Sequence, residues 1–197
     1  MRADNSVRAE RTRALLLEAA LGAFAERGFH GTSTRNIAER AGLSSAALYV
    51  HHQSKEELLF EISKAGHEET LAIVQRAAAS SDDHLERLSA LVHDYVLFHV
   101  EKHTMARVIN YEMAALTPEH RAHVRRIRHQ IDTVIHGVLT SGVEASVFTT
   151  PDPRMTAVAL ESLGIDIARW YRPNGGWDPK QIAAAYVEMG LRLLGVD

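Results

Sequence analysis

The sequence predicts an all-α protein of about nine helices. Apolar residues recur three and four positions apart along most of its 197 residues, as in Leu16, Ala19, Ala20 and Ala23, and this is the spacing of one helix face. Residues that commonly start or stop helices separate the apolar runs. No segment shows the convincing alternation of polar and apolar residues that indicates a β-strand. The expected architecture is an N-terminal three-helix unit followed by a larger helical domain.

Composition narrows the classes of function. The chain has no cysteine, which removes disulfides, thiolate zinc sites and a thiol nucleophile and suits a reducing cytosol. No apolar run approaches the ~20 residues that span a bilayer, so we expect no membrane partner. The net charge is −3, yet residues 1–65 carry nine Lys/Arg against eight Asp/Glu, with four arginines before residue 14. This asymmetry permits nucleic-acid binding by the N-terminal part without demonstrating it.

Three helices are expected at the N-terminus. The first carries the apolar run around Leu16 and stops at Gly28. After a turn, a short helix is expected over residues 34–41, with Ser33 or Thr34 as its cap. Another short helix follows from about residue 45 to residue 51.

The two short helices form a recognisable pattern. Gly42 lies in the turn between them, where a positive φ is easiest for glycine, and Ser44 suits the cap of the second helix. Ala38 allows the helices to cross closely, while Ile37 and Leu48 would fix the pair onto the first helix. This is the helix-turn-helix pattern, in which the second helix enters the DNA major groove.

Six further helices complete the chain. Ser54 and Glu57 have the spacing of a capping box and open a long helix through Val74. Two Asp-Pro pairs, at residues 152–153 and 178–179, combine a cap with a proline at the first helical position. The expected later helices cover 85–96, 106–115, 118 to about 142, 153–171 and 179–194.

A family resemblance is carried by these motifs. The segment Leu16–Leu58 contains AFAERGFHGTSTRNIAERAGLSSAALYVHHQSKEEL, which resembles the DNA-binding domain of the TetR family of bacterial transcription regulators. Near the C-terminus, the chain reads ESLGIDIARWYRPNGGWDPKQIAAAY, which is similar to the branch of acyl-CoA-responsive repressors of fatty-acid and steroid catabolism. The resemblance implies a DNA-binding domain over residues 8–54 and a helical ligand-binding and dimerisation domain over residues 55–197.

The same resemblance implies the function. It indicates a non-enzymatic, homodimeric repressor in the bacterial cytoplasm that binds a palindromic double-stranded operator, because two-fold protein symmetry mirrors operator symmetry. A small-molecule effector, in this branch an acyl-CoA thioester, would release the DNA, with no other cofactor and no metal. The last two helices would pair with their copies. They carry small residues that would allow close approach, although intrachain packing explains them equally: Ala157, Ala159, Gly164, Ala183, Ala184 and Gly190.

Candidate DNA contacts follow the helix-turn-helix motif. Helix N-terminal amides favour phosphate, serine hydroxyls reach phosphates or base edges, and Ala46 can pack on a thymine methyl. Tyr49 and His51 match family positions that contact the backbone, and Lys55 is expected as a phosphate point charge. The N-terminal arginines could form a minor-groove arm or a frayed tail. The full set of expected contacts is Thr34, Arg35, Ser44, Ser45, Ala46, Tyr49, His51 and Lys55.

The middle helices are expected to enclose the effector pocket. Three arginines are candidates for an anion contact such as a CoA phosphate, namely Arg107, Arg169 and Arg172; a basic run at residues 125–128 reads as a solvated face or another such contact. The candidate lining residues, taken from helical faces, are Phe98, Val108, Tyr111, Glu112, Ile131, Ile135, Leu163, Ile167 and Trp170.

Two alternatives remain at this point. The effector could be a drug or aromatic compound acting on the same fold. From a different class, His93-Asp94 resembles the dyad of a helical metal-dependent hydrolase, although the sequence supplies no matching set of further ligands. His99 and His103 have the i, i+4 spacing of a zinc pair, but no HExxH motif completes it, so we interpret them as solvated or pocket-lining histidines.

The adjacent histidines at the end of the third helix are expected to differ. His51 falls on the family's own histidine position and is interpreted as a backbone contact or local cap. His52 falls where the family usually has an aromatic residue that packs between the helix-turn-helix and the fourth helix. A buried histidine needs a hydrogen-bond partner, and burial would lower its pKa.

Overall fold

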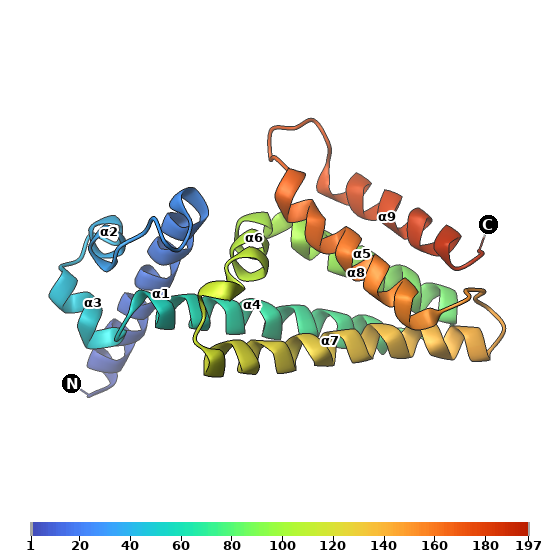
Figure 1. Ribbon diagram of the computed structural model, residues 1–197, viewed down its shortest axis with the longest axis horizontal. Coiled ribbons are helices and arrows are strands. Elements are labelled where there is room, and N and C mark those ends of the chain that lie inside the picture. Colours follow the sequence, from blue (N-terminus) through green and yellow to red (C-terminus); the bar gives the residue numbers. More distant parts are fainter. Residues whose placement is uncertain (1, 197) are drawn as a thin grey trace.

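The computed structural model describes residues 2–196, with the side chains of residues 6–196. That range contains helices and turns but no strand, which confirms the all-α class and the predicted helix number (Figure 1). The helices are α1 (Arg2–Arg27), α2 (Thr34–Arg40), α3 (Ser45–His51), α4 (Lys55–Ala78), α5 (His84–Glu101), α6 (His103–Tyr111), α7 (Pro118–Glu144), α8 (Pro153–Trp170) and α9 (Pro179–Leu193), with a 3-10 helix, η1 (Met113–Ala115), after α6.

Helix starts follow the predicted caps closely. Ser33 caps α2 and Ser44 caps α3, each hydroxyl accepting from a backbone N–H three residues on. Asp152 and Asp178 cap α8 and α9 ahead of a proline in the first turn. Ser54 caps α4. These contacts are local in sequence, and so they could be recognised from residue order alone.

The three N-terminal helices pack as the helix-turn-helix pattern requires. Leu16, Phe24, Ile37 and Leu48 are all buried between α1, α2 and α3. Gly42 has a φ of 68° in the turn between α2 and α3, a conformation that costs glycine little. This unit lies at one end of the molecule (Figure 1).

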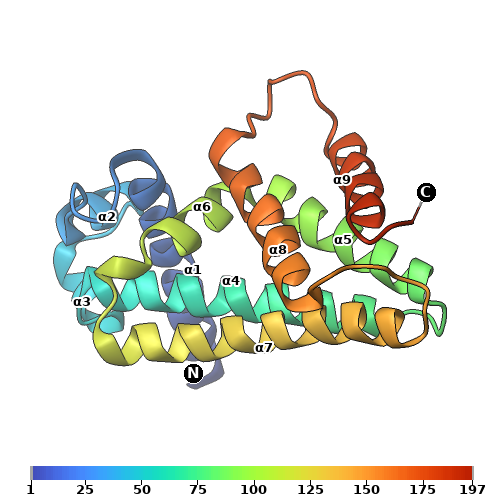
Figure 2. The same cartoon turned by 45° about the vertical axis from the view of Figure 1, so that its right-hand side comes forward.

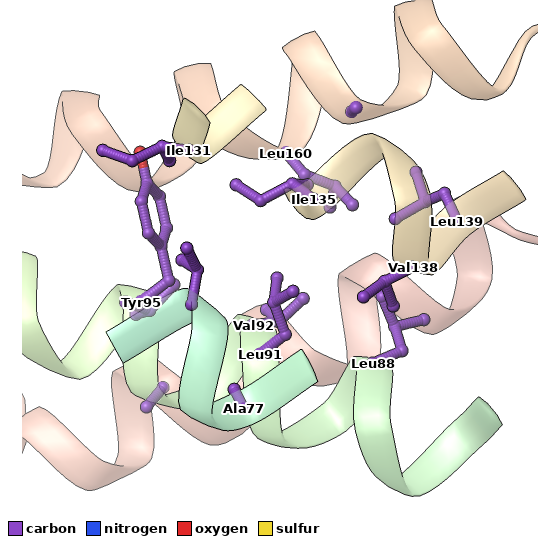
Figure 3. Close-up of a cluster of buried hydrophobic side chains, with 14 of the residues drawn as sticks. Ala77, Leu88, Leu91, Val92, Tyr95, Ile131, Ile135, Val138, Leu139 and Leu160 are labelled. Atoms are coloured by element: carbon purple, nitrogen blue, oxygen red, sulfur yellow. The ribbon is translucent and has the colours of Figure 1, made fainter. Parts of the chain in front are cut away.

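The larger domain is built around two long helices. α4 and α7 run side by side along most of the molecule, and α5, α8 and α9 stack on one side of them (Figures 1 and 2). Leu91 and Tyr95 of α5 meet Ile135 of α7 and Leu160 of α8 in the apolar core (Figure 3). The hydroxyl end of Tyr95 reaches toward Ile131 (Figure 3).

The core of the N-terminal unit extends beyond the predicted domain boundary at residues 54–55. Val108 and Ile109 of α6, and Leu116 and Val124 near the start of α7, pack in the same apolar cluster as Leu16 of α1. α6 is therefore part of both domains, which makes it a physical connection between them.

One expectation needs revision, and one alternative that the sequence left open is narrowed. α1 begins at Arg2, so the segment expected to be a flexible arm or a frayed tail is the first part of a helix. Of the small residues on the last two helices, Ala157 and Ala183 are fully buried within the chain. Gly164 lies against the ring of Tyr95, and Gly190 lies near Val92. Those four residues serve intrachain packing.

Among the helices within residues 2–196, none combines the length and apolar character that a bilayer span requires.

Candidate functional site

The outer face of α3 is exposed and chemically varied. Ser45 and Ala46 lie at its start, and Tyr49 and Val50 lie one turn later, with Tyr49 55% and Val50 79% exposed. Leu48, on the opposite face, is completely buried. The burial of Leu48 fixes the helix and turns the other four side chains outward, as a recognition helix requires.

Val50 is a residue that the sequence did not single out. A branched aliphatic side chain that is 79% exposed on a short helix has no packing explanation within the chain. Its methyl groups suit contact with a thymine methyl, as does Ala46. The available signal was its spacing of four residues from Ala46 on one helix face.

α2 and α3 are joined by polar contacts at this surface. Oγ1 of Thr34 lies 3.1 Å from the hydroxyl of Tyr49, which links the start of α2 to the recognition helix. Arg35 is exposed and donates to Glu39 at 2.8 Å, and this hydrogen bond raises the arginine pKa. Ser44 is engaged as the cap of α3 through the N–H of Ala47.

Lys55, expected as a phosphate contact, has partners within the chain. Its ammonium donates to the backbone carbonyls of Phe29 at 2.8 Å and Thr32 at 2.7 Å. The same nitrogen lies 4.3 Å from the centre of the Phe29 ring. Lys55 therefore ties α4 to the turn between α1 and α2. Its side chain is half-buried. The backbone carbonyls of this short turn need hydrogen-bond donors, and Lys55 supplies one to both of them.

The two histidines separate as the sequence predicted. His51 is half-buried at the end of α3. His52 is 1% exposed, and neither ring nitrogen has a hydrogen-bond partner among the described residues. Its nearest charged neighbour is Glu61, at 3.8 Å from Nδ1 to Oε1. Burial lowers the His52 pKa, as expected for a desolvated imidazole.

A second polar feature lies inside the larger domain. Helices α4 to α8 converge on a cavity of about 20 Å³, whose apolar walls include Ile109, Ile131 and Ile165. The volume admits about one water-sized group. Seven polar side chains face this cavity: His67, Thr70, Tyr95, His99, Asn110, Arg128 and Glu161.

Arg128 is the centre of this cluster. Its Nη1 donates to Oδ1 of Asn110 at 2.7 Å and lies 3.4 Å from Nε2 of His67. Nδ1 of His67 donates to the carbonyl of Ser63 at 2.7 Å, which leaves Nε2 as the acceptor for Arg128. Within the described residues, no carboxylate lies within ion-pair distance of this guanidinium.

Burial favours the uncharged forms of the two histidines and the glutamate that line the cavity. Burial lowers the pKa of His67 and of His99 to about 4. Burial, with help from Asp132, raises the pKa of Glu161 to about 7. Oε1 of Glu161 is buried and lacks a hydrogen-bond partner within residues 2–196. The cavity thus combines one fixed cation with neutral or weakly acidic groups.

The predicted lining residues do not form one pocket. Ile131 lines the polar cavity, whereas Ile135 and Leu163 line a small apolar cavity beside it. Phe98 borders a separate groove between α4 and α5. Trp170 borders an open apolar groove of about 800 Å³ near the α8–α9 loop.

The remaining candidates lie away from the cavity. Val108 and Ile167 are buried in the two apolar cores, and Tyr111 is half exposed to solvent. Glu112 lies beside Gly28 at the end of α1. Helical faces alone do not show which of these residues share a cavity, because the rotation of each helix is set by tertiary packing.

The three candidate arginines have distinct partners. Arg107 donates to the carbonyl of Ala25 at 2.8 Å and so joins α6 to α1. Arg169 pairs with Asp166 on the surface of α8. Arg172 donates to the backbone carbonyls of Arg169 and Tyr171. Arg128, from the basic run at residues 125–128, is the arginine that enters the cavity.

Histidines do not assemble the metal centre of the hydrolase alternative. His93 and Asp94 form an exposed pair on α5 at 2.9 Å. His99 and His103 each donate to a backbone carbonyl. Within residues 2–196, the group of potential metal ligands that does come together is His52, Glu57 and Glu61, which does not include the His93-Asp94 pair.

Comparison with known proteins identifies the family. Residues 16–62 match the family model described as bacterial regulatory proteins, tetR family. Residues 81–194 match the model of the tetracyclin repressor-like C-terminal domain. The chain belongs to the TetR family. The two matches cover the helix-turn-helix unit and the larger domain in turn.

This TetR-family protein is similar to several transcription regulators in sequence and in structure. It is 31% identical to the HTH-type transcriptional repressor KstR2 of Mycobacterium tuberculosis over 89% of each chain. A crystal structure of a tetR-family regulatory protein from Rhodococcus RHA1 is 37% identical and superposes with a TM-score of 0.90 over 94% of this chain and 98% of that one. AibR, solved in complex with isovaleryl coenzyme A and operator DNA, is 27% identical with a TM-score of 0.83, over 90% and 97% of the two chains.

Proposed function

We propose that this TetR-family protein is a homodimeric transcriptional repressor that binds a palindromic operator and is released by an acyl-CoA thioester. The exposed face of α3, formed by Ser45, Ala46, Tyr49 and Val50, carries the DNA-binding part of the proposal. No Arg or Lys lies on α3. Methyl contacts, the Tyr49 hydroxyl and DNA shape would then supply much of the specificity.

The dimer would form through α8 and α9. These helices expose large apolar side chains: Met155, Val158 and Leu163 on α8, and Met189 and Leu193 on α9. Burying such a surface is favourable, and a two-fold pair of helices would place two α3 helices on successive half-sites. A DNA-bound regulator of this kind acts in the bacterial cytoplasm.

Support for an acyl-CoA effector comes from the relatives and the larger domain. AibR binds isovaleryl coenzyme A, and this chain has a buried polar cavity in the domain that corresponds to it. Arg169 and Arg172 remain our candidates for CoA phosphates, since both are exposed near the mouth of the α8–α9 groove. Binding energy can move the DNA-binding helices only if the effector prefers one conformer.

A drug or aromatic effector is the second candidate. The open groove of about 800 Å³ is lined by Trp170, Trp177, Ile182 and Tyr186. The two indole rings lie edge to face with centroids 5.6 Å apart. Planar aromatic compounds suit such walls, so this groove favours the second candidate on its own evidence.

The test is a release assay on selected DNA. Operator duplexes are first selected from a random library with the purified dimer, and their binding is followed by fluorescence anisotropy. Acyl-CoA thioesters of increasing chain length, free CoA and planar aromatic compounds are then titrated separately. Release by a thioester but not by CoA supports the proposal. Release by aromatic compounds alone supports the second candidate, and failure to select any duplex contradicts both.

A further inference from the structure

The polar cavity between α4 and α8 is unusual for a site that receives a plain hydrocarbon chain. Polar side chains from five helices face it, although burying polar groups without partners costs free energy. Arg128 is half-buried there, and its acceptors within hydrogen-bond distance are neutral, namely Asn110, His67 and the thioether sulfur of Met113. A partly buried cation without a carboxylate at ion-pair distance is stabilised by an anion.

The carboxyl of Glu161 can supply a further hydrogen-bond donor to an anion in the cavity. Its Oε1 is buried without a partner, and its raised pKa of about 7 means that it carries a proton for much of the time near neutral pH. An anion beside it would favour that protonated form further. The carboxyl could then donate to a ligand oxygen, and the Tyr95 hydroxyl on the cavity wall offers a second donor.

Size limits what can enter. A cavity of about 20 Å³ has room for one small polar group at the end of a molecule and excludes a nucleotide, which must lie elsewhere. We propose that this cavity binds the terminal carboxylate of the effector's acyl group, with Arg128 as its counter-ion and Glu161 and Tyr95 as donors. This inference rests on the proposed acyl-CoA function and specifies a dicarboxylic acyl group.

Asn110 gives the site a route to the DNA-binding unit. It lies on α6, one turn after Arg107, which bonds to Ala25 of α1. A carboxylate that draws Arg128 away from Asn110 would break the 2.7 Å hydrogen bond between α7 and α6. The effector would therefore favour a conformer in which α6 and α1 are repositioned.

The experiment compares two thioesters of equal length. Glutaryl-CoA ends in a carboxylate and valeryl-CoA ends in a methyl group. Both are titrated against the protein by calorimetry and against the protein–operator complex by anisotropy. We expect glutaryl-CoA to bind and to release DNA at concentrations at least about tenfold lower, as a charge-assisted hydrogen bond predicts.

Single substitutions test whether the preference for glutaryl-CoA arises in this cavity. Arg128→Met should erase the preference for glutaryl-CoA, so that the ratio of the two dissociation constants measured on the same variant falls to about 1. Arg128→Lys, which keeps the charge, covers the case in which the methionine variant does not fold, and should retain part of the preference. Glu161→Gln should retain most of it, because an amide also donates. Arg125→Met, an exposed change on the same helix, is the matched control and should change nothing.

The outcomes separate the inference from the function beneath it. Equal potency of the two thioesters overturns the carboxylate assignment and leaves acyl-CoA regulation standing. If neither thioester releases the operator, the proposed function fails. Binding of free glutarate to the protein then tests whether the cavity is a carboxylate site. Glutarate binding that is lost in Arg128→Met supports a carboxylate site, and no binding of glutarate overturns it.

Discussion

The guanidinium of Arg107 donates a 2.8 Å hydrogen bond to the carbonyl of Ala25, across 82 positions of the chain. Ala25 lies in the last turn of α1, where carbonyls lack partners within the helix. A cation there also interacts favourably with the helix dipole. The bond therefore fixes the end of the first DNA-binding helix to α6, whose next turn contacts the polar cavity through Asn110.

Removing this bond should weaken communication between the sites. In Arg107→Met, we expect operator affinity without effector to stay within about threefold, while the change in affinity caused by saturating effector falls by about five- to tenfold, within the usual range of coupling energies. Operator titrations with and without effector measure both quantities. An unchanged ratio would show that α6 does not transmit the signal through Arg107.

Arg35 provides a test of phosphate contact. The side chain is exposed on α2 and pairs with Glu39, so Arg35→Ala should weaken operator and random duplex equally. It should also reduce the slope of log affinity against log salt by about 1. Arg126→Ala, on the exposed face of α7, is the control. A change confined to sequence preference would make Arg35 a base-reading residue instead.

Replacing Lys55 should lower the stability of the folded protein. Replacing it with methionine removes the donor shared by the carbonyls of Phe29 and Thr32. Unsatisfied carbonyls in this half-buried turn should lower the free energy of unfolding by about 1–3 kcal/mol. Chemical denaturation of the free protein measures this. If Lys55→Met unfolds like the parent but binds DNA weakly, the phosphate role expected from the sequence is correct.

His52 is a position where a change should stabilise the protein. His52→Phe removes two buried nitrogens without partners and adds apolar contact, so the free energy of unfolding should rise by on the order of 1 kcal/mol at pH 8. The folded-state pKa of His52 lies below 6.5, so its stability contribution is present above pH 6.5 and is lost as pH falls. The variant should therefore lose less stability in acid. A lower melting temperature at pH 8 would mean that the phenyl ring overpacks the site.

Glu161 gives the opposite pH signature. Its folded-state pKa is raised to about 7 by burial, with Asp132 opposing ionisation, Arg128 favouring it, and Tyr95 lining the same cavity. The folded state thus holds a proton that the unfolded state releases above about pH 4.5, so the carboxyl destabilises the fold as pH rises. Glu161→Gln should match the parent near pH 4.5 and exceed it by on the order of 2 kcal/mol at pH 8.

A parallel variant controls this experiment. Glu144→Gln changes an exposed carboxyl at the end of α7 and should not show the pH-dependent gain. His67 and His99 also titrate, with folded pKa values of about 4, but they are common to parent and variant and cancel in the difference. A constant difference between pH 4.5 and pH 8 would contradict a raised Glu161 pKa.

The sequence predicted the DNA-binding unit better than the effector site for a physical reason. Caps such as Ser44 and the positive φ of Gly42 depend on neighbours within a few residues. The cavity depends on which faces of five helices meet. Arg128 appeared as part of an exposed basic run, and only the packing of α7 against α4 and α6 directs it toward Asn110 and His67.

The central claim is that this protein binds operator DNA and releases it when an acyl-CoA thioester binds. Anisotropy of a selected operator duplex, titrated with glutaryl-CoA at fixed salt, tests this directly. We predict full release, with free CoA inactive at the same concentration. An operator complex that every acyl-CoA leaves intact would contradict it.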